Sequence, residues 1–80
     1  MDEREITEWA VRGLTAEIER LDAKVRKGRE LVRRIDAGEP ARAGSSRESI
    51  LATISESREE MERLDKDRSD LRWKLDVERP

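Results

Sequence analysis

Residues 11–35 read VRGLTAEIERLDAKVRKGRELVRRI, and their apolar side chains recur at alternating spacings of three and four residues. That spacing is the heptad pattern of a helix that packs lengthwise on a second helix. The a positions carry β-branched residues and the d positions carry Leu, Gly or Ile, in the order Val11, Leu14, Ile18, Leu21, Val25, Gly28, Val32 and Ile35. Because a disordered polar chain does not hold such a phase, the pattern predicts a helix.

The second half of the chain repeats this pattern. Its stripe consists of Ile50, Ile54, Ser57, Met61, Leu64, Arg68, Leu71 and Leu75. Between the two stripes, Gly38 is a natural end for a helix and Pro40 prevents the helix from continuing. Ser45, followed by Glu48 three residues later, has the spacing of a capping box at the start of a helix. The predicted elements are a helix at about residues 3–37, a turn at 38–45 and a helix at about 46–78.

The two stripes also agree on how the helices pair. When residues are matched so that their numbers sum to 82, the pairs from Val32 with Ile50 to Thr7 with Leu75 each join an a position to a d position, as an antiparallel coiled coil requires. The pairs include Val25 with Ser57, Gly28 with Ile54, and Leu14 with Arg68. The chain is therefore predicted to be all-α, an antiparallel two-helix coiled-coil hairpin that forms a single domain over residues 1–80. An uninterrupted parallel dimer would instead place two glycines and a proline inside a helix, at a cost of several kcal/mol.

Composition removes most kinds of chemistry. The 80 residues include no Cys and no His, which excludes a disulfide, a thiolate zinc site, a cysteine nucleophile and a histidine base. We predict no catalytic residue, no metal site and no cofactor. The chain begins with acidic residues and has no apolar run longer than three, which predicts neither a signal peptide nor a membrane span, and hence a cytoplasmic protein. Arginine is used 14 times and lysine 4 times, a bias that fits a GC-rich bacterial or phage genome.

Several apolar residues fall outside the predicted helix–helix seam. A lone two-helix hairpin buries only one narrow seam, so these residues predict self-association, most simply a homodimer that forms a four-helix bundle. The predicted interface consists of Ile6, Trp9, Ala10, Trp73 and Val77 at the open end, with Leu31 and Leu51 near the turn. Trp9 and Trp73 sum to 82 and so stand at the same level. The alternative is that the helix phase drifts near the termini and both tryptophans close the hairpin.

Charge is segregated along the predicted rod. Residues 24–58 carry a net charge of +4 and the remainder carries −6, although the whole chain is only −2. A basic stripe on the first helix consists of Lys24, Arg26, Lys27, Arg33 and Arg34. It either docks on an acidic surface or a phosphate backbone, or it compensates the helix dipole and pairs within the helix as Asp22–Arg26 and Glu30–Arg34. At its core position, Arg68 is expected to reach Glu17 or Asp65.

These features favour a non-enzymatic helical-hairpin interaction protein, such as an adaptor, regulator or inhibitor. We expect it to bind itself and a macromolecular partner. The expected partner is a protein, and we predict no membrane binding. The first alternative is a nucleic-acid-binding hairpin dimer that uses the stripe from Lys24 to Arg34. The second rests on a resemblance: Glu17-Ile18-Glu19-Arg20-Leu21-Asp22 resembles the opening helix of the all-α chorismate mutases, and Ser46-Arg47-Glu48 resembles part of their second helix. That family implies a third helix and a catalytic lysine after the first helix, whereas residues 34–42 contain no lysine.

Overall fold

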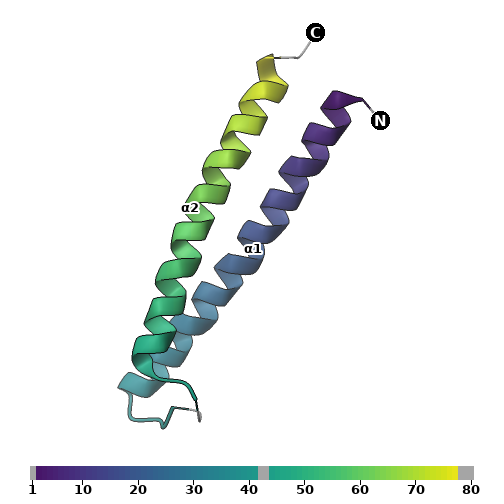
Figure 1. The fold of residues 1–80 in the computed structure, drawn as a ribbon. Helices are drawn as coiled ribbons and strands as arrows, with labels where there is room; N and C mark the ends of the chain where they lie inside the picture. Colours follow the sequence, from purple (N-terminus) through teal and green to yellow (C-terminus); the bar gives the residue numbers. More distant parts are fainter. Residues whose placement is uncertain (1, 42–43, 78–80) are drawn as a thin grey trace.

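The computed structural model describes residues 2–41 and 44–77, and within them it contains two helices and no strand. Helix α1 spans Glu3–Asp36 and helix α2 spans Arg47–Val77. The two run antiparallel, with the turn at one end and both chain termini at the other (Figure 1). This confirms the predicted all-α hairpin. Three positions of the predicted elements, the turn residues Arg42 and Ala43 and the helix-end residue Glu78, lie outside the described residues.

The start of α1 and its end follow the local chemistry of the sequence. The Asp2 carboxylate accepts a hydrogen bond from the Glu5 backbone N–H at 2.8 Å, which caps the helix. At the other end, Gly38 has a φ of +98°, and its N–H donates to the Ile35 carbonyl oxygen at 3.0 Å. Gly38 therefore ends α1 where the sequence predicts, because it has a left-handed backbone conformation that glycine adopts without strain.

The start of α2 differs from the prediction by one residue. The capping box predicted for Ser45 and Glu48 is wrong, because Ser46 and Ser49 form it instead. The Ser46 N–H donates to Ser49 Oγ at 3.0 Å, and the Ser49 N–H donates to Ser46 Oγ at 3.1 Å. The Ser46 carbonyl accepts the first helical hydrogen bond, from the Ile50 N–H. Ser46 is thus the residue with cap geometry, and the Ser49 hydroxyl performs the role that the pattern assigned to a glutamate.

The two predicted stripes form the seam, the face along which the helices pack. Every residue of both stripes is buried or half-buried; the most buried positions of the seam are Thr7, Leu21, Val25, Gly28, Ile54 and Ser57. A methyl group placed on Gly28 would lie 2.8 Å from Cγ1 of Ile54. The predicted pairing of Gly28 with Ile54 is therefore confirmed, and the missing side chain is what lets the helices approach here.

The resulting molecule is a thin rod of 59 × 19 × 16 Å. Its radius of gyration is 17.6 Å, whereas a compact chain of this length has about 12 Å. Within the described residues, no side chain is less than 2 % exposed. The chain as a whole exposes 6303 Å², compared with roughly 5,000 Å² for a compact protein of 9.3 kDa. The hairpin therefore has a seam in place of a thick core.

Candidate interaction surfaces

The open end of the rod exposes large apolar side chains. Trp9 is 60 % exposed and Trp73 is 69 % exposed, while Ile6 and Val77 are similarly open to solvent. The structure thus contradicts the alternative in which both tryptophans close the hairpin. The Arg12 guanidinium carbon lies 5.6 Å from the centre of the Trp9 ring, so the flat face of this indole is partly covered by a cation.

The two tryptophans lie on opposite faces of the rod. Trp9 is two residues from each of the seam residues Thr7 and Val11, a rotation of about 200° around the helix. Trp73 has the same relation to Leu71 and Leu75. Each indole therefore projects away from the other helix, and the residues that the sequence groups into one interface form two separate patches at the same level.

The patch on α1 is larger than the sequence pattern suggests. Five exposed and uncharged residues follow one another on its outer side at spacings of three, one, three and three: Ile6, Trp9, Ala10, Gly13 and Ala16. We call this set the α1 outer face. Sequence reasoning missed Gly13 and Ala16 because small residues add little to a hydrophobic pattern. On a helix surface, however, small residues let another backbone approach closely.

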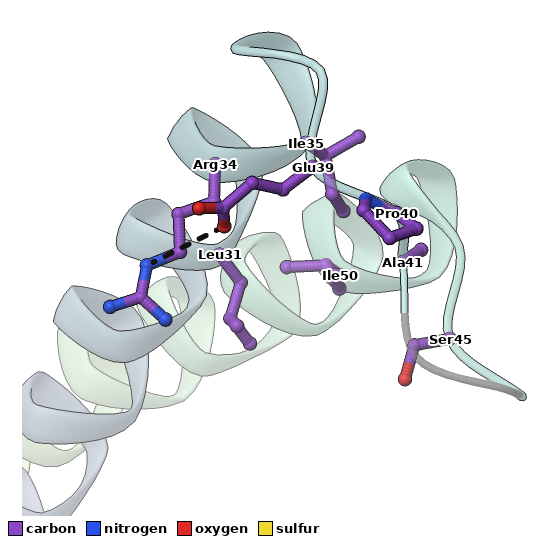
Figure 2. Close-up of a pocket in the computed structure, with 8 residues that line it drawn as sticks. All are labelled: Leu31, Arg34, Ile35, Glu39, Pro40, Ala41, Ser45 and Ile50. Carbon is purple, nitrogen blue, oxygen red and sulfur yellow. Dashed lines mark ion pairs between the residues drawn. The ribbon is translucent and has the colours of Figure 1, made fainter.

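A shallow groove runs between α1, the turn and the start of α2. Figure 2 shows its end nearest the turn, where a cavity of about 150 Å³ is lined by Leu31, Arg34, Ile35, Glu39, Pro40, Ala41, Ser45 and Ile50. An adjoining section of about 220 Å³ shares Leu31, Ser45 and Ile50, and adds Lys24, Lys27, Gly28, Ser49 and Thr53. We call the two sections the turn groove. Both are smaller than the 300–1,000 Å³ of typical ligand pockets, whereas a hollow beside them has about 420 Å³ and is lined by Lys27, Glu30, Leu31, Arg34 and Ser45.

The two leucines predicted at the interface are separated by the rod. Leu31 is half-buried and lines both sections of the turn groove. Leu51 is 38 % exposed and lines neither of them. In the heptad, Leu31 occupies a g position and Leu51 an e position, which lie on opposite sides of the seam. The shared level of these leucines therefore does not make them one surface.

The basic stripe divides into paired arginines and open lysines. Arg26 Nε lies 3.0 Å from Asp22, and Glu30 receives both Arg33, at 2.6 Å, and Arg34, at 3.4 Å. The predicted intrahelical pairs are thus confirmed. Lys24 and Lys27 are exposed and have no ion pair within the part of the chain that the structure describes, and both line the turn groove.

Hydrogen bonding from Arg33 lowers the pKa of the exposed Glu30 carboxylate, and the charges of Arg33 and Arg34 act in the same direction. The Arg20 guanidinium lowers the pKa of Glu17 in the same way. Because these pKa values are lower in the folded chain, the pairs contribute fully to the stability of the hairpin at a pH above the ordinary glutamate pKa. Their contribution is lost as the pH falls through the lowered values.

Arg68 occupies the seam but directs its charge outward. Its side chain is 19 % exposed, with Nη2 donating to Asp65 Oδ1 at 2.7 Å and Nη1 donating to Thr15 Oγ1 at 3.3 Å. Of its two expected partners, Asp65 is confirmed and Glu17 is wrong, because Glu17 pairs with Arg20 on its own helix. The Nε atom is buried and lacks a hydrogen-bond partner among the described residues.

Substitution of Arg68 by leucine is expected to stabilise the hairpin by about 1 kcal/mol, because the change removes the buried, unpartnered Nε and lengthens the apolar seam. Urea denaturation measures the effect. Arg63→Leu is the matched control, since Arg63 is exposed, pairs with Glu60 on the same helix and should change stability little. A destabilised Arg68→Leu variant would show that the Thr15 and Asp65 contacts outweigh the buried donor.

The described residues contain no helix that is long and apolar enough to span a membrane. Nor do they contain a group of three or more carboxylates arranged to hold a metal ion. Among the described residues, three features can contact a partner: the α1 outer face, the exposed pair Trp73 and Val77, which we call the Trp73–Val77 patch, and the turn groove. Comparisons with protein-family models, curated proteins and solved structures found no match to the chain.

Proposed function

We propose that the chain is a non-enzymatic helical-hairpin interaction protein that associates with itself and binds a macromolecular partner as an adaptor, regulator or inhibitor. The observation that carries this proposal is the α1 outer face, where Trp9 and Ile6 are 60 % and 56 % exposed beside three small residues. Contiguous exposed apolar residues of this kind mark interaction sites in soluble proteins.

The surface area of the rod supports the same proposal. The chain exposes about 1,300 Å² more than a compact protein of its mass. A standard protein–protein interface buries roughly 800 Å² on each partner. A dimer contact of ordinary size would therefore remove more than half of the surface that each rod exposes in excess, and would bury apolar residues that the seam leaves in solvent.

The alternative functions have less support. Three arginines of the basic stripe already bind carboxylates on their own helix, which leaves two lysines for a phosphate backbone. No aromatic residue lies among these bases to stack on nucleotides. The resemblance to the all-α chorismate mutases implies a third helix and a catalytic lysine after the first helix, whereas the described residues form two helices and residues 34–42 contain no lysine.

We expect opposite outcomes for a double substitution on the α1 outer face and for a substitution of Trp73. Ile6→Glu/Trp9→Glu is expected to convert a dimer into a monomer in sedimentation velocity, because it places charges in the apolar contact, while circular dichroism shows unchanged helix content. Trp73→Glu is the matched control, because Trp73 stands at the same level with similar exposure but on the opposite face, and this variant should remain dimeric. Loss of the dimer in both variants, or in neither, would argue against the α1 outer face as the interface. If only the α1 outer face forms the dimer contact, the Trp73–Val77 patch remains available for the macromolecular partner.

A further inference from the structure

We infer that a second copy of the chain binds antiparallel along one side of α1, so that the open end of each rod lies over the turn groove of the other. This inference rests on the proposed self-association and specifies its geometry. The side concerned consists of the c and g positions of the α1 heptads, which are Glu3, Ile6, Ala10, Gly13, Glu17, Arg20, Lys24, Lys27, Leu31 and Arg34. We call these residues the lateral stripe.

The lateral stripe is complementary to itself when reversed. Matching each residue with the one that brings the sum of their numbers to 37 joins a c position to a g position every time. The pairs are Glu3 with Arg34, Ile6 with Leu31, Ala10 with Lys27, Gly13 with Lys24, and Glu17 with Arg20. Acid meets base, apolar meets apolar, and the two smallest residues meet the two lysines, whose long apolar stems need that space. No layer joins two like charges.

This register also lets two rods of this length overlap almost completely. Its midpoint, between residues 18 and 19, is close to the centre of α1 at Glu3–Asp36, so the two rods overlap over nearly their whole length. A contact from residue 3 to residue 34 extends about 46 Å. It brings the acidic open end of one copy to the basic turn end of the other, which opposes the −6 and +4 halves of the two chains.

Two competing arrangements lack this complementarity. In a parallel α1 dimer, each residue of the stripe meets its own copy, so Glu17 faces Glu17 and Lys24 faces Lys24. On α2, the c and g positions pair in the register with sums of 130, whose midpoint is nearest to the same level, and this register places Glu60 opposite Asp70, another like-charge layer. The sequence of charges therefore favours α1 against α1, in the antiparallel sense.

The structure leaves this side open at both ends. Ile6 is 56 % exposed, Ala10 and Gly13 are exposed, and a methyl group on Gly13 would meet no atom of the hairpin within 4 Å. At the other end, Lys24 and Lys27 border the turn groove beside the half-buried Leu31. An isoleucine from a second copy would enter this groove against Leu31.

The acid–base layers use surface groups that already have partners in their own chain: Glu3 pairs with Lys74 at 3.2 Å and Arg34 with Glu30 at 3.4 Å, so a second copy would extend these pairs. Glu17 and Arg20 already pair on the surface of their own helix, so a second copy would turn this pair into a ring of four alternating charges. Trp9, next to Ile6 on the outer face, would come near Lys27 of the second copy, where an ammonium over an indole adds attraction. The exposed apolar open end and the open lysines of the turn groove thus become parts of one contact.

Cross-linking tests the geometry directly, since the chain has no cysteine of its own. Ala10→Cys and Lys27→Cys chains, one of them carrying a size tag, are mixed and treated with a short bismaleimide. The mixture should yield predominantly mixed dimers, several-fold above the yield of either variant alone. Ser55→Cys replaces Lys27→Cys in the control, because Ser55 is exposed at the same level on the other helix and should not cross-link to Ala10→Cys.

The outcomes separate the inference from the proposed function. Efficient cross-linking of Ala10→Cys to itself would show parallel α1 helices and overturn the antiparallel arrangement. Equal cross-linking with Lys27→Cys and with Ser55→Cys, or none with either while sedimentation reports a dimer, would overturn the lateral stripe but leave self-association standing. A monomer in sedimentation would overturn the proposed function, and the inference with it.

Discussion

Replacing Leu21 with aspartate is expected to unfold most of the hairpin at room temperature. Leu21 is 5 % exposed in the centre of the seam. The substitution loses the burial of a leucine side chain, worth about 2–3 kcal/mol, and leaves a carboxylate in an apolar layer, which costs several kcal/mol more unless it takes up a proton. A domain of this size rarely has more than about 5 kcal/mol of stability, so the sum exceeds what the fold can absorb.

Far-ultraviolet circular dichroism measures the loss of helix directly. The matched control is Ala23→Asp, which introduces the same charge two residues away, on the exposed side of α1. Aspartate has a modestly lower helix propensity than alanine, so this control should lose about 0.7 kcal/mol and remain helical. Comparable helix loss in the two variants would show that helix propensity, and not the seam, holds the fold together.

Gly28→Leu is expected to produce the second largest effect. A single added carbon at this position already lies 2.8 Å from Ile54 Cγ1 and 3.1 Å from its Cδ1, and leucine adds three more carbons. Overpacking of this kind costs about 1–3 kcal/mol or more, which outweighs the gain of about 1 kcal/mol that any helix obtains when glycine is replaced. The variant should unfold at markedly lower urea concentration than the natural chain.

Two further variants isolate the steric cause. At concentrations where the chain is monomeric, Gly13→Ala is expected to stabilise the hairpin by about 0.5–1 kcal/mol, because nothing within the single chain crowds the added methyl group and the helix gains propensity. Adding Ile54→Ala to Gly28→Leu removes the atoms that clash and should recover part of the stability. A Gly28→Leu chain as stable as Gly13→Ala would mean that the helices do not approach closely at this layer.

The helical hairpin was predictable because its signals are periodic and redundant. The heptad stripes from Val11 to Ile35 and from Ile50 to Leu75 agree on one register, and the Gly28–Ile54 contact confirms it. A periodic pattern averages over many residues, so the weak members Ser57 and Arg68 do not obscure it. The end of α1 was equally predictable, since glycine takes the left-handed conformation that ends a helix without strain.

Features that depend on one side chain or on the direction of a side chain were not predictable. Ser46 and Ser49 cap α2 because the hydroxyl of Ser49 both accepts and donates, and Ser45 and Ser46 each have a possible capping partner three residues later. Thr15 was missed as a partner of Arg68 because a threonine beside the seam carries no pattern of its own.

The grouping of Trp9 with Trp73 illustrates a different limit. Sums of residue numbers give the level along the rod but not the face, and the two indoles share a level while pointing in opposite directions. Adding the helical angle of each residue separates the α1 outer face from the Trp73–Val77 patch. The same correction separates Leu31 from Leu51. Level and angle together, rather than level alone, define the candidate surfaces.

Sedimentation equilibrium of the unmodified chain, over a range of protein concentrations, tests self-association most directly. We expect a mass that rises toward twice the 9.3 kDa of one chain as the concentration increases, because dimerisation follows mass action. A mass that stays at that of a single chain from micromolar to millimolar concentration would contradict this expectation.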